Sequence, residues 1–267
     1  MTQPVAGKRI VVRYEPDGVR TFEDDVATEW PVTIVLNGEE FATLVCSPEE
    51  VEDLAVGYMA SEGVLADIAA LEDLSYDDRT GTVYVEIAGV DSWLIDSGSK
   101  RVLTSCCGKS RQGFVFYADM RTAREIESRL IKLTYDSCLS MMRAMESKSG
   151  LFKATGGVHN AALFHADGTL LLARTDIGRH NAIDKLYGYC LRNGVSMADK
   201  VLAFSGRVSS EVLLKAAKMR CETLLSKSAV TDLAINLAED LGITIVGFIR
   251  GGAMNVYSHA DRITVGE

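Results

Sequence analysis

The sequence predicts an α/β protein in two parts: an N-terminal α+β domain over residues 1–147 and an α/β domain over residues 148–267. Three observations lead to this prediction. In the C-terminal part, short apolar runs alternate with helical patterns, as they do in parallel βαβ units. In the N-terminal part, Asn37-Gly38 separates two β-rich runs, which is a strong hairpin signal. The polar run from Ser147 to Gly150 interrupts the pattern between them and indicates the boundary.

The N-terminal part is predicted to consist of hairpins and helices. Residues 10–14 alternate weakly and predict an edge strand, and residues 31–36 and 41–45 predict the two strands of the hairpin. Ser47-Pro48-Glu49-Glu50 has the form of a capping box and predicts a helix that ends at Gly63. The remaining elements are predicted as helices at 67–71, 120–131 and 135–146 and a strand at 82–87.

The C-terminal part begins with a second hairpin and continues as a strand–helix alternation. The strands 161–164 and 169–173 flank the turn signal His165-Ala166-Asp167-Gly168. Asn181 is predicted to cap a helix that ends near Gly194. The alternation that follows is strand 201–204, helix 210–219, strand 223–225, helix 231–241 and strand 243–248.

Composition excludes several classes of protein. A formal net charge of −9 argues against a nucleic-acid binder, which usually carries a basic excess. The sequence has no apolar run of the length that a membrane-spanning helix needs, and no basic-then-apolar N-terminal pattern. We therefore expect a cytoplasmic protein that binds neither nucleic acid nor membranes.

Two adjacent cysteines, Cys106 and Cys107, lie in a polar stretch from Lys100 to Arg111 with two basic residues on each side. Nearby cations lower the pKa of a thiol and favour the reactive thiolate. The stretch is predicted as a loop, and we assign the loop to residues 96–113. The other four cysteines lie in apolar or helical surroundings and are expected to be buried: Cys46, Cys138, Cys190 and Cys221. No pair has C-x-x-C spacing, so no metal site is predicted.

Small residues, hydroxyls and cations follow the predicted parallel strands at their carboxyl ends, where α/β sheets bind ligands. The three loops are Ser205-Gly206-Arg207-Val208-Ser209, Ser226-Lys227-Ser228 and Ile249-Arg250-Gly251-Gly252. The first two lead into helix N-termini, which attract anions. The loops therefore predict a site for a phosphate- or nucleotide-bearing ligand, although neither the P-loop pattern nor G-x-G-x-x-G is present.

Two further stretches add polar groups. Thr155-Gly156-Gly157-Val158-His159 precedes the second hairpin, and Asp176-Ile177-Gly178-Arg179-His180-Asn181 follows it. Asp, Arg and His close together at a helix N-terminus are suited to orienting a ligand through hydrogen bonds. Of the four histidines, His159 and His180 are predicted to be functional, and His165 and His259 to lie on the surface.

These stretches together resemble the FdhD family of formate dehydrogenase accessory proteins. The resemblance is carried by Ser105–Lys109, Thr155–His159, Asp176–Ala182 with Asp184-Lys185, Ser205–Glu211 and Val246–Arg250, and by the Asn37-Gly38 hairpin and the segment Cys46–Gly63. It covers the chain after about the first thirty residues, and its most specific block is Asp176–Lys185. The family is described as carrying sulfur from a cysteine desulfurase to the molybdenum cofactor of formate dehydrogenase.

The resemblance implies a C-terminal three-layer α/β domain similar to the cytidine deaminase fold, a mobile cysteine loop and a homodimer. It also implies a sulfurtransferase-type carrier with a cysteine persulfide on Cys106 or Cys107, and formate dehydrogenase and a cysteine desulfurase as partners. The bound substrate would be the molybdenum bis(molybdopterin guanine dinucleotide) cofactor, which a guanine nucleotide can mimic. The cofactor-binding residues implied are Gly178, Arg179, His180, Ser205, Gly206, Arg207, Ser226, Phe248, Ile249, Arg250, Gly251, Gly252 and Ala253.

The cysteine loop departs from the family pattern. Many members have C-x-x-C there, whereas this sequence has Cys106-Cys107. One alignment leaves Lys109 at the position of the second cysteine, and another leaves Thr104 at the first, so the persulfide thiol is either cysteine. Adjacent cysteines form a disulfide only with strain, so one reactive thiolate is expected.

Three functions remain open from the sequence: the sulfur carrier, a cofactor-binding chaperone without essential thiols, and a nucleotide-processing enzyme. Zinc deaminase chemistry is not expected, because Asn160 and Ala161 follow His159 where H-x-E is required, and P-C-x-x-C is absent.

Overall fold

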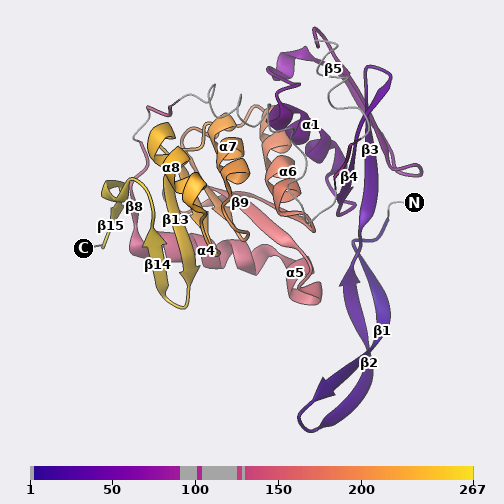
Figure 1. Ribbon diagram of the computed structural model, residues 1–267, viewed down its shortest axis with the longest axis horizontal. Coiled ribbons are helices and arrows are strands. Elements are labelled where there is room, and N and C mark those ends of the chain that lie inside the picture. Colours follow the sequence, from indigo (N-terminus) through magenta and orange to yellow (C-terminus); the bar gives the residue numbers. More distant parts are fainter. Residues whose placement is uncertain (1–2, 91–100, 104–124, 128–129, 267) are drawn as a thin grey trace.

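The structure is a computed structural model that describes residues 3–90, 101–103, 125–127 and 130–266. It contains two main sheets, one in each part of the chain, and a long two-stranded ribbon (Figure 1). None of the described helices is both long enough and apolar enough to cross a membrane.

The larger sheet has six strands in the order β10-β9-β11-β12-β13-β14. The strands are β9 (His159–His165), β10 (Leu170–Asp176), β11 (Lys200–Phe204), β12 (Thr223–Ser226), β13 (Thr244–Arg250) and β14 (Ala253–Val256). The central strands β11, β12 and β13 are parallel, and β9, β10 and β14 run antiparallel to their neighbours. Every residue of β11 and β12 is buried, as expected where helices cover both faces.

Helices cover both faces of this sheet (Figure 1). The helices α6 (Arg179–Arg192), α7 (Ser210–Lys218) and α8 (Asp232–Leu241) lie on one face, and α4 (Tyr135–Lys148) lies on the other. Alternate residues of β11 divide accordingly: Leu202 and Phe204 pack with α6–α8, and Val201 and Ala203 pack with the buried methionines of α4. These three layers confirm the predicted α/β class, and they place the methionine face of α4 in the core.

The smaller sheet has five strands in the order β5-β6-β3-β4-β7 and packs against α1 (Val51–Glu62). The strands are β3 (Trp30–Leu36), β4 (Glu39–Cys46), β5 (Leu71–Asp77), β6 (Thr82–Ile87) and β7 (Arg101–Leu103). The turn between β3 and β4 is formed by Asn37 and Gly38 with φ of 50° and 84°, which confirms the predicted hairpin.

Helices α1 and α6 join the two parts at unusually close range. A Cβ built on Gly57 of α1 would lie 1.9 Å from the Asp184 carbonyl oxygen, and one on Gly188 of α6 would lie 1.9 Å from the Asp53 carbonyl oxygen. Only glycine permits the two backbones to approach in this way, so this contact fixes how the two parts sit against each other.

The ribbon of β1 (Ala6–Glu15) and β2 (Gly18–Ala27) projects from the body of the molecule (Figure 1). The sequence predicted only an edge strand at 10–14, because apolar and polar residues alternate, weakly, over these residues alone. Ile10 and Tyr14 are 71% and 80% exposed, so cross-strand pairing rather than burial holds these residues extended.

Several predicted elements differ in the structure. Residues 125–127 and 130–132 are neither helical nor extended, so the helix at 120–131 is wrong for the described residues. The helix at 67–71 is a single 3₁₀ turn, Ile68–Ala70, and three residues of the loop predicted at 96–113 form β7. Ser47 does not cap α1, whose N-cap is Glu50 with φ of 48°.

The remaining short elements are α5 (Gly150–Thr155), β8 (Leu133–Thr134), β15 (Ile263–Thr264) and a 3₁₀ turn at Ala260–Arg262. The domain boundary between residues 147 and 148 stays a prediction. α4 precedes it in sequence but packs on the larger sheet, so packing groups this helix with the C-terminal part.

Candidate functional site

One edge of the larger sheet brings together the loops that the sequence singled out. Ser205, after β11, exchanges hydrogen bonds with Asn160 at the start of β9: the Ser205 N–H donates to the Asn160 carbonyl, and the Asn160 N–H donates to the Ser205 hydroxyl, each at 2.9 Å. The Phe248 N–H donates to the Ser228 carbonyl at 3.0 Å, which ties β13 to the loop after β12. The predicted convergence of the three loops is therefore present.

Some of the predicted residues shape these loops through contacts within the protein. The Ser226 side chain is fully buried and donates to the Gly206 carbonyl at 2.8 Å. Gly206 has no space for a side chain, because a Cβ there would lie 2.7 Å from the Phe204 ring. Arg207, which follows Gly206 in the sequence, is exposed. We conclude that Ser226 and Gly206 set the loop geometry, whereas Arg207 faces solvent.

The turn between β13 and β14 presents its backbone and a cation to solvent. Phe248 adopts φ of 51°, which is unfavourable for a bulky residue, and the strand register shifts between Gly247 and Arg250. Gly251 and Gly252 also have positive φ, of 60° and 73°. The Arg250 guanidinium lies 5.0 Å from the centre of the Phe248 ring. Ile249 is buried, and the residues from 250 to 253 are exposed.

A pocket of about 160 Å³ lies between this turn and α4. Its charged lining residues are Arg143 and Glu146 of α4, Lys227 after β12, and Arg250. Leu139, Met142 and Ile249 provide apolar walls, and Gly251 and Gly252 complete the lining. Three cations against one carboxylate make this pocket suited to an anionic ligand with an apolar body.

The sequence analysis did not assign α4 to the site. Arg143 and Glu146 are charged residues on the solvent side of an amphipathic helix, which is an ordinary pattern. Only the tertiary packing of α4 across β12 and β13 places them beside Ile249 and Arg250. Lys227 carried a signal, because it lies within one of the three predicted loops.

Asp176 lies at the same sheet edge, but its carboxylate binds partners within the protein. Both it and Lys185 are fully buried, and the Lys185 ammonium lies 2.8 Å from its carboxylate. The carboxylate also accepts from the Ser47 N–H at 2.9 Å and the Gly178 N–H at 2.7 Å. Asn181, predicted as a helix cap, instead donates to Asp176 at 3.0 Å.

This Asp176 cluster also connects the two parts of the chain. Asn181 donates to the Val45 carbonyl at 3.0 Å, and Lys185 donates to the Ser47 carbonyl at 3.1 Å. The Ser47 hydroxyl accepts from the Ile177 N–H at 3.1 Å, which explains why it does not cap α1. The block Asp176–Lys185 therefore builds the junction between the two parts, and its acid is not available to a ligand.

The predicted histidines occupy different environments. The His159 Nδ1 lies 3.4 Å from the Ser205 hydroxyl, and burial, with a smaller contribution from Arg179, lowers the pKa of this imidazole. His180 and Arg179 begin α6 beyond the buried Gly178, both half-buried, and His180 lies 3.7 Å from Glu211. His259 was predicted on the surface but is only 20% exposed, with Nε2 3.2 Å from the Ala238 carbonyl.

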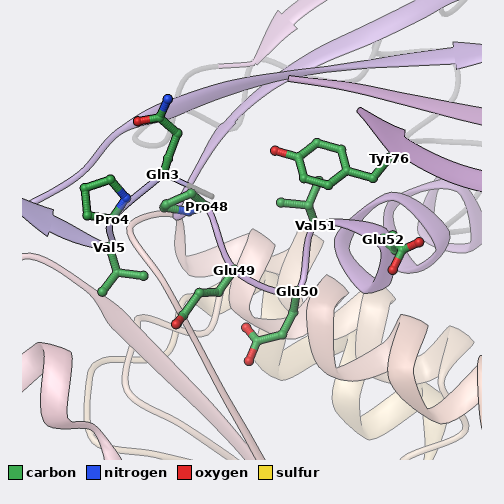
Figure 2. A pocket seen from close by; sticks show the side chains of 9 residues that line it. All are labelled: Gln3, Pro4, Val5, Pro48, Glu49, Glu50, Val51, Glu52 and Tyr76. Atoms are coloured by element: carbon green, nitrogen blue, oxygen red, sulfur yellow. The ribbon is translucent and has the colours of Figure 1, made fainter. Parts of the chain in front are cut away.

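A second, larger pocket of about 600 Å³ lies between the N-terminal segment and the turn that leads into α1 (Figure 2). Its lining is Gln3, Pro4, Val5, Pro48, Glu49, Glu50, Val51, Glu52 and Tyr76. Three of these side chains are carboxylates, and burial raises the pKa of Glu50 although Lys185 and Arg174 oppose the shift. An anionic cofactor is therefore better matched to the basic pocket beside Arg250.

The four cysteines within the described residues are buried, as predicted. Burial raises the pKa of Cys46 and Cys190 to about 12, and that of Cys138 and Cys221 to about 11. None of the four is therefore a thiolate near neutral pH. Cys106 and Cys107 lie outside the described residues. The described chain ends before them at Leu103 of β7, which pairs with Leu44 of β4, two residues before Cys46.

Proteins similar to this one match it over nearly the whole chain. The protein named sulfur carrier protein FdhD from Bacillus subtilis (strain 168) is 50% identical over 263 residues, covering 98% of this chain and 99% of its own. The protein of the same name from Geobacillus kaustophilus is 51% identical over 261 residues, covering 98% of each chain.

A crystal structure from Desulfotalea psychrophila, described as that of a formate dehydrogenase accessory protein, has the same fold. It superposes with a TM-score of 0.79 at 22% identity, over 97% of this chain and all of the other. A model of the FdhD/NarQ family matches residues 27–264, a range that contains both sheets, the Asp176 junction and the basic pocket. The chain belongs to the FdhD/NarQ family.

Proposed function

We propose that this protein carries sulfur to the molybdenum bis(molybdopterin guanine dinucleotide) cofactor and is needed for formate dehydrogenase activity. It receives the sulfur from a cysteine desulfurase as a persulfide on Cys106 or Cys107. It acts in the cytoplasm as a homodimer. The names of the B. subtilis and G. kaustophilus relatives support the sulfur-carrier role, and the description of the D. psychrophila protein supports the connection to formate dehydrogenase.

The observation that carries the proposal is the state of the other thiols. Cys46, Cys138, Cys190 and Cys221 are buried, with pKa values raised to about 11 or 12. A persulfide carrier needs an accessible thiolate. Only Cys106 and Cys107 remain, and their neighbours in the sequence, Arg101, Lys109 and Arg111, favour the thiolate form.

The first step is a thiol–persulfide exchange. The thiolate of Cys106 or Cys107 attacks the terminal sulfur of the desulfurase persulfide. A new sulfur–sulfur bond forms on the carrier while the sulfur–sulfur bond of the desulfurase breaks, and the desulfurase cysteine leaves as a thiolate. In the second step the sulfur–sulfur bond of the carrier breaks: its terminal sulfur passes to the cofactor as sulfane sulfur, and the carrier cysteine leaves as a thiolate.

The cofactor is the substrate of this carrier, and the residues at the sheet edge fit its chemistry. Arg143, Lys227 and Arg250 line the basic pocket, and Arg207 is exposed nearby on the loop after β11. Guanidinium and ammonium groups are the usual partners of phosphate oxygens. The exposed Gly251 and Gly252 permit close approach of a ligand to the backbone.

Mass spectrometry tests the proposal after incubation of the protein with a desulfurase and cysteine. The expected result is one added sulfur on the wild type and none on the double variant Cys106→Ala/Cys107→Ala. Because that variant keeps the four buried thiols, it also shows whether those thiols accept sulfur. The two single variants identify the acting cysteine. A wild type without added sulfur, or a double variant that accepts sulfur as well as the wild type, would contradict the proposal.

A further inference from the structure

A third pocket, of about 200 Å³, lies where the two parts of the chain meet. Its walls come from the turn that leads into α1, from the end of α4, and from β9 and β10. The lining residues are Glu49, Glu50, Met145, Lys148, Ser149, Asn160, Ala173, Arg174 and Thr175. An apolar cavity of about 150 Å³ can hold benzene, so this pocket has room for a ligand of about six to eight non-hydrogen atoms.

The Glu50 carboxylate has cations near it but no hydrogen-bond donor among the described residues. Its oxygens lie 3.9 Å from the Lys185 ammonium and 3.9 Å from the Arg174 guanidinium, which is beyond hydrogen-bond distance. The three N–H groups of Lys185 already bind one other carboxylate and two backbone carbonyls. Figure 2 shows the side chains of Glu49 and Glu50 extending to the same side, away from Tyr76. An ammonium group that enters the pocket can therefore reach two carboxylates.

Other lining residues offer hydrogen-bond donors from deeply buried side chains. Asn160 is 4% exposed, and its carboxamide oxygen accepts from the Thr175 hydroxyl at 3.0 Å, but within the described residues its amide N–H groups have no acceptor. Ser149 is also 4% exposed, and its hydroxyl oxygen accepts from the Phe152 N–H at 3.1 Å. The Ser149 hydroxyl proton has no acceptor in the same part of the chain. Because buried polar groups are almost always hydrogen-bonded, these free donors indicate an acceptor that enters the pocket.

Lys148 adds a positive charge beside these donors. It ends α4 directly before Ser149, is exposed, and forms no ion pair with the residues that the structure describes. The Arg174 guanidinium is already bound to Asp53 at 3.2 Å. Lys148 is therefore the cation of this pocket that is available to a carboxylate.

The pocket thus combines carboxylates that need a donor with donors and a cation that need an acceptor. A molecule that carries an ammonium and a carboxylate close together satisfies both sets, and an α-amino acid carries the two groups on one carbon. Met145 and Ala173 are the apolar residues of the lining, and the volume leaves room for a short side chain.

We infer that this pocket binds a small α-amino acid. Glu49 and Glu50 bind its ammonium group. Lys148, Ser149 and Asn160 bind its carboxylate. The inference goes beyond the proposed function and does not depend on it.

Calorimetric titration of the full-length protein with L-alanine, propionate and ethylamine tests the inference, because propionate lacks the ammonium group and ethylamine lacks the carboxylate. The wild type should bind L-alanine about tenfold or more tightly than either, since each loses hydrogen bonds to a charged group. Glu50→Gln should weaken L-alanine binding about tenfold without weakening propionate binding. Lys148→Met should weaken the binding of L-alanine and propionate without weakening that of ethylamine.

Glu72→Gln and Lys153→Met change exposed residues of β5 and α5 outside the pocket, so they are matched controls and should leave the affinity for L-alanine unchanged. A wild type that binds no L-alanine, or binds it no more tightly than ethylamine, would overturn the inference. A Glu50→Gln protein with the wild-type affinity for L-alanine would overturn it as well. The sulfur-loading measurement on Cys106 and Cys107 does not depend on any of these outcomes.

Discussion

The Asp176 junction and the basic pocket lie at the same edge of one sheet, yet their charges are used in opposite ways. Asp176 and Lys185 are fully buried and surrounded by hydrogen-bond partners from both parts of the chain. Lys227 and Glu146 are more than one third exposed, and Arg250 is exposed. Charged residues in a sequence block that marks a family are therefore not all ligand contacts. Burial separates those that build the scaffold from those that can reach a ligand.

The largest effect is expected from breaking the buried pair. Lys185→Met leaves the Asp176 carboxylate without its cation and should lower the free energy of unfolding by about 3–5 kcal/mol. Denaturant unfolding measures this change. Lys153→Met, which removes an exposed lysine on α5, should change it by less than about 0.5 kcal/mol. Equal changes in the free energy of unfolding for the two variants would show that the buried Asp176–Lys185 pair does not stabilise the fold.

A backbone contact at the same junction gives the second effect. Gly57→Ala places a Cβ 1.9 Å from the Asp184 carbonyl and forces α1 and α6 apart, which should cost about 3 kcal/mol. Gly150→Ala is the control, because no atom lies within 4 Å of its Cβ position. Thermal unfolding of the two variants compares them. A Gly57→Ala protein as stable as the control would mean that the helices are not held at this distance.

Glu50 sharpens the comparison, since it is a junction carboxylate that is only partly satisfied. Burial raises the pKa of Glu50 above its usual 4.5, so ionisation opposes folding, and its contribution to stability is present at low pH and lost as pH rises through that raised value. Glu50→Gln should therefore be more stable than the wild type at pH 7, with a difference that shrinks below about pH 4.5. Denaturation midpoints at pH 4 and pH 7 test this. A variant that is less stable at pH 7 would contradict the sign.

The smallest effect on stability is expected in the pocket. Arg250→Ala removes an exposed side chain and should change the free energy of unfolding by less than about 0.5 kcal/mol. The same variant should bind GDP more weakly, because a cation at the rim is lost. Parallel unfolding and titration experiments separate the two properties. Destabilisation as large as that of Lys185→Met would remove the distinction between scaffold and site.

Much of the fold was predictable because its signals are local. Each signal lies within a few residues of the sequence. Two are hairpin turns, at Asn37-Gly38 and at His165–Gly168, and the third is the strand–helix alternation after Lys200. The ribbon was underestimated because only residues 10–14 alternate in hydrophobicity. The predicted helix at 120–131 is wrong for the described residues.

The site was less predictable, because it depends on contacts between distant segments. The three strand-end loops were found, since parallel strands must end at one edge. The roles of Asp176 and Asn181 were misread, because their partners Ser47 and Val45 are about 130 residues away in the sequence. Arg143 and Glu146 were missed for the same reason, since only the packing of α4 brings them to the pocket.

Formate dehydrogenase activity in cells that carry Cys106→Ala/Cys107→Ala tests the central claim most directly. The account predicts that activity falls to the level of cells lacking the protein, while the amount and folding of the variant stay unchanged, because the four buried thiols cannot replace the two that are lost. One of the single variants should reproduce the loss. Full activity in the double variant would contradict the sulfur-carrier mechanism and favour a chaperone that binds the cofactor without thiol chemistry.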